Sequence, residues 1–136
     1  MPRRRWFWFA LAGSACGRPP AAPDVFLPMM AGGWRRTALD HPSVSDAPDP
    51  VPRSAVQQFQ RAAYEGPGKL DARLYVLDSP AVAVELAQRW RPSADTVFFY
   101  TGRFFVVVKW EDADRKALQA FVADVQKRLG KPKEGA

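Results

Sequence analysis

The sequence predicts a single α+β domain: an antiparallel sheet with its elements in the order ββαββα and both helices packed on one face. Three observations lead to this fold class. Residues 69–77 alternate between apolar and polar side chains, residues 96–110 are rich in β-branched and aromatic residues around a turn, and residues 114–129 repeat apolar side chains with a helical period. Helices gathered on one face of an antiparallel sheet would bury all of these apolar surfaces.

The first predicted hairpin spans residues 56–77. Its second strand points one set of side chains towards the core, namely Leu70, Ala72, Leu74 and Val76. The preceding segment Tyr64-Glu65-Gly66-Pro67-Gly68 has the composition of a tight turn. Residues 57–64 fit either a helical face or a strand, and pairing across this turn favours the strand.

A helix is predicted to follow, because Ser79 can cap free amides and Pro80 suits the first helical position. Its apolar stripe consists of Ala83, Leu86, Ala87 and Trp90. Pro92 ends it, since a residue that precedes proline disfavours helical geometry.

The second predicted hairpin pairs residues 96–100 with residues 103–110, and Thr101-Gly102 makes the reversal. Both faces of its second strand are largely apolar. We therefore expect this hairpin to lie centrally in the sheet, or to have its second face covered by the leading segment or by a partner.

The last predicted helix begins at Asp112 or Asp114, because acidic side chains favour a helix start. One stripe holds its apolar residues, which are Leu118, Phe121, Val122, Val125 and Leu129. Gly130 is the expected C-cap, and Pro132 follows it. Asp124 and Arg128 are spaced for an ion pair along the helix.

The amino-terminal part is predicted to direct export. Residues 1–15 combine three arginines, an apolar run of about ten residues and small residues at the exit, in the order of a signal peptide. Residues 16–25 read as a Pro-rich tether, residues 26–55 as an irregular leading segment, residues 56–130 as the α+β domain, and residues 131–136 as a tail. We therefore expect an extracytoplasmic protein of the periplasm or cell envelope.

Cys16, the single cysteine of the chain, directly follows Gly13-Ser14-Ala15 at the end of the apolar run. This arrangement resembles the lipobox of bacterial lipoproteins, although Gly13 stands where that pattern usually has leucine. The resemblance implies that Cys16 carries a lipid that holds the domain at a membrane. Ordinary cleavage after Ala12 or Ala15 is the alternative for processing, and Arg3-Arg4-Arg5-Trp6-Phe7 leaves the twin-arginine route open for export.

Charge and composition argue against several classes of function. The formal net charge is +6, and without Arg3, Arg4 and Arg5 it falls to +3, which is scattered rather than clustered and predicts no nucleic-acid partner. One histidine and one cysteine predict neither a multi-histidine metal site nor an intramolecular disulfide. The sequence predicts no cofactor and no catalytic residue, because His41, Ser43 and Asp46 lie in a Pro-rich loop that would not hold a triad rigidly.

Two arginine-containing segments are the candidates for ligand binding. The first is Arg89-Trp90-Arg91, in which a guanidinium can stack on the indole and two arginines can hold a carboxylate or phosphate. The second is the pair Arg35 and Arg36, and Glu65 is a candidate carboxylate. Favourable basic charge at a helix end, next to a buried Trp90, is the simpler explanation of the first segment.

Four segments taken together carry a resemblance: Gly-Gly-Trp-Arg-Arg (32–36), Tyr-Glu-Gly-Pro-Gly (64–68), Gln-Arg-Trp-Arg-Pro (88–92) and Gly-Arg-Phe-Phe-Val-Val-Val (102–108). They resemble a group of uncharacterised exported bacterial proteins. The resemblance covers most of the chain after residue 26 and implies a single exported domain, with no particular activity.

The functional hypothesis is therefore a non-enzymatic binding or accessory module of the cell envelope, with an envelope protein or a small ligand as its partner. An enzyme or enzyme subunit is the alternative. A pocket that joins Arg89 or Arg91 to Glu65 or Asp95 would favour the enzyme, whereas a continuous exposed apolar patch would favour a protein partner.

The processing of Cys16 can be tested by mass spectrometry of the membrane fraction. We expect a mature chain that begins at Cys16 and carries the added mass of a lipid, because the only cysteine stands at the end of the apolar run. A mature chain with an unmodified amino-terminal residue would contradict lipidation.

Overall fold

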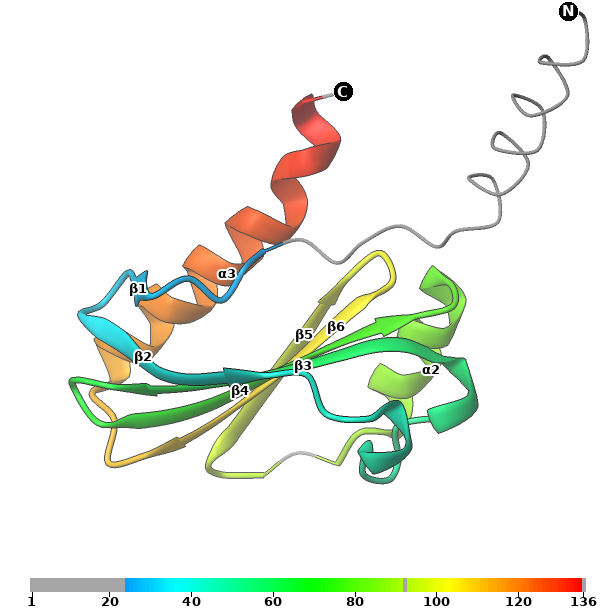
Figure 1. Cartoon of the computed structure of the whole chain (residues 1–136), viewed down its shortest axis with the longest axis horizontal. Coiled ribbons are helices and arrows are strands. Elements are labelled where there is room, and N and C mark those ends of the chain that lie inside the picture. The colour runs from blue at the N-terminus through cyan, green and yellow to red at the C-terminus, as the bar shows by residue number, and fades with distance from the viewer. Residues whose placement is uncertain (1–23, 92, 136) are drawn as a thin grey trace, which may run out of the picture.

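The computed structural model describes residues 24–91 and 93–135, the last five by their backbone alone. The predicted signal peptide, Cys16 and most of the predicted tether lie outside the described residues, as do Pro92 and Ala136. The chain runs through β1 (Met29–Met30), β2 (Trp34–Asp40), two short 3-10 turns (Val44–Asp46 and Arg53–Ala55), β3 (Val56–Glu65), β4 (Lys69–Leu77), α2 (Pro80–Arg89), β5 (Thr96–Thr101), β6 (Phe104–Glu111) and α3 (Arg115–Gly135) (Figure 1).

All six strands belong to one antiparallel sheet with the spatial order β1-β2-β3-β4-β6-β5. The α+β class is confirmed. The predicted order ββαββα corresponds to β3 through α3, but it lacks β1 and β2, which come first in the chain. Figure 1 shows that the sheet is strongly twisted and curled.

Both predicted hairpins are present. Residues 57–64 form a strand rather than a helix, and β3 pairs with β4 from Val56↔Leu77 to Glu65↔Lys69. Gly68 in the connecting turn has φ +155°, and a Cβ atom there would lie 2.5 Å from the carbonyl oxygen of Asp112. Glycine is therefore needed at this position for close approach to the segment that leads into α3.

Both helices begin as the sequence predicts. The Ser79 hydroxyl accepts a hydrogen bond from the Val82 amide at 3.4 Å, and Pro80 is the first residue of α2. The Asp114 carboxylate accepts one from the Ala117 amide at 3.0 Å. These caps occupy amides that would otherwise lack partners in the first helical turn.

The predicted end of the last helix was wrong. The helix continues through Gly130 and Pro132 to Gly135, so Gly130 is not its C-cap. A proline inside a helix removes one backbone hydrogen bond, and it does not prevent the neighbouring residues from keeping helical geometry.

The prediction that both helices pack on one face was also wrong. Leu74 and Val76 of β4 pack in one core with Phe121 and Val125 of α3. Tyr75 and Leu77 pack in a second core with Ala83 and Leu86 of α2. Since successive side chains of a strand point to opposite faces, α2 and α3 lie on opposite sides of the sheet.

The leading segment is more ordered than predicted. Val25 and Phe26 are fully buried in the α3-side core, so the chain is already packed at the end of the predicted tether. Trp34 of β2 is also fully buried, and its indole nitrogen donates to the Ala117 carbonyl of α3 at 2.9 Å. The Tyr64 hydroxyl donates to the Leu27 carbonyl at 2.8 Å. These bonds hold residues 25–34 against α3 and the sheet.

Phe121 lies at the centre of this core. Its side chain is fully buried, and it makes edge-to-face contacts with Trp34 and Tyr64 at ring-centroid distances of 6.4 and 5.0 Å. Its position unites α3, β2 and β3.

We predict that Phe121→Ala lowers the free energy of unfolding by about 3–5 kcal/mol, because it leaves a cavity between three elements. Chemical denaturation of the full chain measures this. The matched control is Val84→Ala, at a side chain of α2 that is 40% exposed, for which we expect a change of less than about 1 kcal/mol. Equal stability of the wild type and Phe121→Ala would contradict this packing.

Candidate functional site

Arg89, Trp90 and Arg91 are brought together by the structure, at the carboxyl end of α2. With Pro50 and Asp49 of the leading segment, and with Ser93 and Thr96, they line a hollow of about 420 Å³. Both arginines are exposed. The carbonyl end of a helix favours cations, so the position of Arg89 is also explained by the helix itself.

One aromatic residue, Trp90, lines this hollow, and it packs on two phenylalanines of the sheet. The Trp90 ring lies 5.9 Å from Phe98 and 5.5 Å from Phe105, and Phe98 stacks on Phe105 at 5.5 Å. Trp90 thus fills the α2-side core and is fixed by its packing.

Neither of the two predicted carboxylates, Glu65 and Asp95, lines this hollow. Glu65 lines a separate hollow beside Lys69, at the turn between β3 and β4. Asp95 accepts hydrogen bonds from the Ser93 and Thr96 hydroxyls at 2.8 and 3.1 Å, and these bonds hold the pKa of its exposed carboxyl below the usual value. A carboxylate stabilised in this way is poorly suited to donate a proton.

Arg35 and Arg36 do not join the Arg89–Arg91 hollow. Arg35 is exposed and stands opposite Glu65 in the β2–β3 register. The Arg36 guanidinium donates a hydrogen bond to the Phe26 carbonyl, and this bond holds the leading segment against β2. Burial of Tyr64, next to Arg36 in the register, raises the pKa of its phenol.

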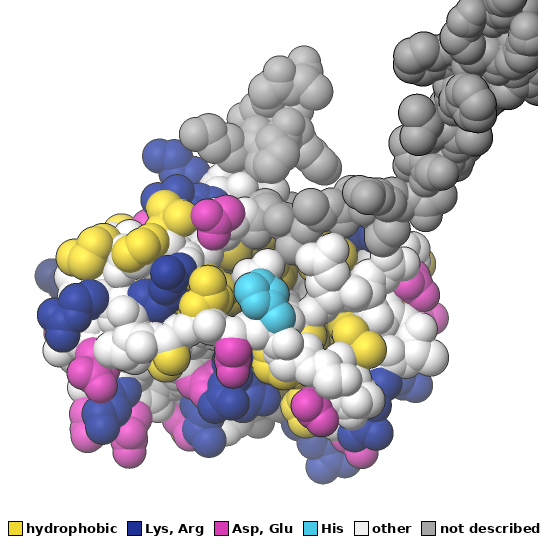
Figure 2. All heavy atoms as spheres, in the orientation of Figure 1, with side chains coloured by type: hydrophobic (Ala, Val, Ile, Leu, Met, Phe, Trp, Pro, Cys, Tyr) yellow, Lys and Arg dark blue, Asp and Glu magenta, His cyan; other side chains and the backbone are white. Residues whose placement is uncertain are grey.

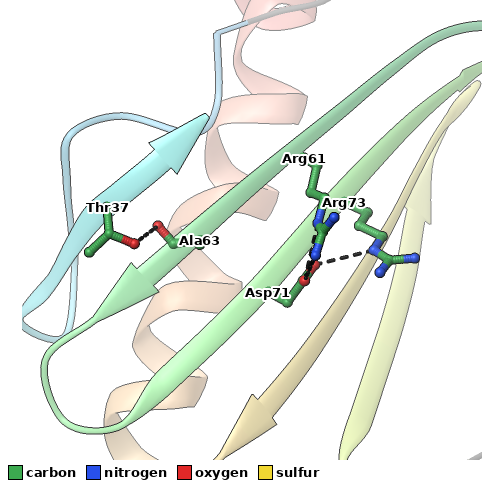
Figure 3. Close-up of polar contacts among 5 residues, drawn as sticks. All are labelled: Thr37, Arg61, Ala63, Asp71 and Arg73. Carbon is green, nitrogen blue, oxygen red and sulfur yellow. Dashed lines mark hydrogen bonds and ion pairs between the residues drawn. The ribbon is translucent and has the colours of Figure 1, made fainter. Parts of the chain in front are cut away.

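A cluster of charged side chains lies on the sheet face opposite α3 (Figure 3). Arg61 and Arg73 stand directly opposite each other on β3 and β4. Asp71 joins them: its carboxylate lies 2.8 Å from the Arg61 guanidinium and 3.2 Å from that of Arg73. In Figure 3, α3 passes behind the sheet on the other side.

The charges of this face alternate in sign. One row of neighbours across the strands reads Arg35, Glu65, Lys69 and Glu111, and Asp71 is opposite Lys109. Figure 2 likewise shows acidic and basic side chains interspersed, without a wide area of one sign. A mixed surface of this kind gives no strong field to attract a polyanion.

An apolar groove of about 480 Å³ lies between α3 and the sheet, and we call it the α3 groove. Its sheet side is formed by Ala94, Val97 and Trp110, and its helix side by Ala113, Arg115, Leu118, Gln119, Val122, Ala123 and Gln126. The helical residues repeat at three- and four-residue intervals, so the groove follows α3 for about three turns, or roughly 17 Å.

Sequence reasoning missed the α3 groove because it placed Val122 on the same stripe as the core residues. The structure buries Phe121 and Val125 completely but leaves Val122 half-buried at the edge of the helix contact. The available signal was the width of the apolar stripe, which continues beyond the positions needed to face the sheet.

Strand β5 forms one edge of the sheet, next to this groove. Its sequence, Thr-Val-Phe-Phe-Tyr-Thr, contains no charged residue and no proline. Natural edge strands usually carry such residues to prevent pairing with other chains.

The backbone of β5 uses only part of its hydrogen-bonding capacity. The Trp110 amide donates to the Asp95 carbonyl at 3.0 Å, and bonded pairs alternate along an antiparallel ladder. The β5–β6 register therefore directs the amide and carbonyl groups of Phe98 and Tyr100 away from β6. Among the described residues, no strand pairs with that side of β5.

Within residues 24–91 and 93–135, no three His, Cys, Asp or Glu side chains are grouped as metal ligands would be. No helix in the same part of the chain is both long and apolar enough to cross a bilayer.

Comparison with known proteins gives no relative: no family model matches the chain, and no curated protein or solved structure is significantly similar to it. The geometry of the described residues is therefore the basis for any functional assignment.

The link between Arg61, Asp71 and Arg73 yields a prediction about stability. Asp71→Asn leaves two arginines facing each other without their shared carboxylate, and we expect a loss of about 0.5–1 kcal/mol in the free energy of unfolding at low salt. The loss should shrink in 1 M NaCl, where charges are screened at about 3 Å.

Chemical denaturation at both salt concentrations measures the effect, with Glu85→Gln on an exposed position of α2 as the control. Adding Arg61→Gln to Asp71→Asn should recover part of the loss by removing the repulsion. A loss that is the same at both salt concentrations would contradict an electrostatic origin.

Proposed function

We propose that this chain is a small exported protein of the cell envelope that acts as a non-enzymatic binding module, with the α3 groove as its binding surface. The partner is an apolar segment of another envelope protein. The single observation that carries the proposal is the apolar groove that runs along α3 beside the uncharged edge strand β5.

The shape of the α3 groove favours a polypeptide over a small ligand. It is open to solvent and follows the helix for about three turns, whereas small-molecule sites are concave and bury most of their ligand. Leu118, Val122 and Val97 offer apolar contact, and the amide groups of Gln119 and Gln126 can bond to a peptide backbone. Apolar grooves with a polar rim are a common way to bind a peptide helix or strand.

The proposed localisation of the protein rests on its sequence. The order of basic, apolar and small residues in residues 1–15 supports export, and the place of Cys16 supports a lipid anchor at the membrane. An anchored domain would present its groove to other proteins of the envelope.

The enzyme alternative has less support. It calls for an arginine and a carboxylate in one pocket, and the hollow with Arg89 and Arg91 is lined by neither Glu65 nor Asp95. Its one acidic residue, Asp49, makes no ion pair with either arginine.

A photo-crosslinking amino acid introduced at Gln119 in living cells tests the function. We expect a discrete adduct with another envelope protein, because Gln119 lies on the rim of the α3 groove. The matched control carries the same photo-crosslinking amino acid at Gln88, an exposed glutamine of α2 on the other side of the sheet. The adduct should be lost when Val122→Lys is added.

Two results would contradict the proposal: no adduct with another protein at position 119, or the same adducts from positions 88 and 119. Retention of the adduct in Val122→Lys would show that the contact does not use the apolar floor.

A further inference from the structure

We propose that two copies of this chain pair through β5, antiparallel and around a two-fold axis at Phe99, so that their sheets become one continuous sheet. This inference extends the proposed function, because it names a second copy as the occupant of the edge beside the α3 groove.

On its outer side, β5 has backbone amides and carbonyls that pair with no other strand among the described residues. The amides and carbonyls of Phe98 and Tyr100 point away from β6, and the Thr96 amide is already bonded to the Ser93 carbonyl at 3.3 Å. A two-fold axis at Phe99 places Phe98 opposite Tyr100 of the second copy. The backbone amide and carbonyl of each of these two residues then have a hydrogen-bond partner in the second copy. The Thr96 amide is not needed as a donor to either of them.

A neighbouring register fits less well. With the axis at Phe98, Tyr100 would be opposite Thr96 of the second copy, whose amide is already bonded to Ser93. One Tyr100 carbonyl per copy would then lack a donor, and a backbone group that loses water without gaining a partner costs free energy.

The aromatic side chains of β5 also suit this pairing. In the proposed register, Phe98 and Tyr100 of the two copies form cross-strand aromatic pairs on the α2 side of the sheet. Within each copy, both rings stack on Phe105, at 5.5 Å for Phe98 and 6.3 Å for Tyr100. Tyr100 is 42% exposed, so a second copy would cover apolar surface that now faces water.

Opposite charges would also meet at the two ends of the paired strands. The same register brings Asp95 of one copy to the turn that carries Arg103 of the other, once on each side of the axis. Among the described residues, the Arg103 side chain has no hydrogen bond or ion pair, and its Nε atom is buried without a partner. The Asp95 carboxylate of the second copy would pair with the accessible part of this guanidinium, since the buried Nε atom itself is out of its reach.

The pairing also has a consequence for the α3 groove. A two-fold axis perpendicular to the sheet keeps each face on its own side, so both α3 helices lie on the same face of the joined sheet. The two grooves then flank the axis and open onto a shared floor formed by the β5 strands.

Sedimentation velocity of the full chain in mild detergent tests the pairing. We expect a monomer–dimer equilibrium, and Tyr100→Lys should raise its dissociation constant at least about tenfold, because a charge on an edge strand blocks pairing. Val84→Lys is the matched control: Val84 is 40% exposed on α2 and is not part of the β5 edge, and its substitution should leave the equilibrium unchanged.

Charge reversal tests the register. Asp95→Arg alone and Arg103→Asp alone should each weaken the dimer, because like charges then meet at both ends. A mixture of the two single variants should form a mixed dimer, since both of its ends again join an arginine to an aspartate. Melting temperatures of the separate variants show that each one is folded.

A chain that remains monomeric up to about 100 µM would overturn the inference, as would equal effects of Tyr100→Lys and Val84→Lys. Failure of the charge-reversed variants to pair with each other would overturn the proposed register. The crosslink from Gln119 to another protein does not depend on pairing, so a monomer that still gives this adduct would refute the dimer and leave the proposed function intact.

Discussion

Strand β4 has two apolar faces, and the rest of the structure depends on this property. Leu74 and Val76 alternate with Tyr75 and Leu77, and all four side chains are buried. Each face therefore has to be covered by another element. α3 covers one face and α2 covers the other. Towards the other end of β4 the α2 side changes to Asp71 and Arg73, which α2 leaves open. There Asp71 forms ion pairs with both Arg73 and Arg61.

The same division produces the two features on which the functional account rests. One stripe of apolar side chains on α3 packs against the sheet. The apolar surface of α3 extends beyond this stripe, and its uncovered part lines the groove beside Val97 and Trp110. β5 ends the sheet, with two apolar side-chain rows and no charge to protect its outer edge. Groove and edge are adjacent, so a partner in one and a second copy at the other would form a single interaction surface.

Local chemistry predicted the elements well, because it acts over a few residues. The turn at Gly66–Gly68, the cap at Ser79 and the start of the last helix near Asp114 each follow from the preferences of individual side chains. The side of the sheet on which each helix packs depends on contacts between distant residues. The sequence predicts two apolar faces for residues 103–110, whereas for residues 69–77 it assigns only Leu70, Ala72, Leu74 and Val76 to the core and so leaves out the buried Tyr75.

Other features had weaker signals in the sequence. β1 and β2 were missed because Pro28 and the two glycines before Trp34 resemble a loop, and the buried indole that anchors them bonds to Ala117, which is distant in the chain. Of the candidate ligand residues, Arg89, Trp90 and Arg91 do share a hollow, since they are consecutive. Their separation from Glu65 and the existence of the α3 groove follow from tertiary packing alone.

The most direct test of the central claim is amide hydrogen exchange along β5, followed by NMR at several protein concentrations. The account predicts that Val97 and Phe99, which bond to β6, are protected at every concentration. The amides of Phe98 and Tyr100 should exchange fast in dilute solution and become protected as the concentration rises. Fast exchange of Phe98 and Tyr100 at all concentrations would contradict the role of β5 as an interaction edge, and equal protection of all four amides in dilute solution would contradict the strand register itself.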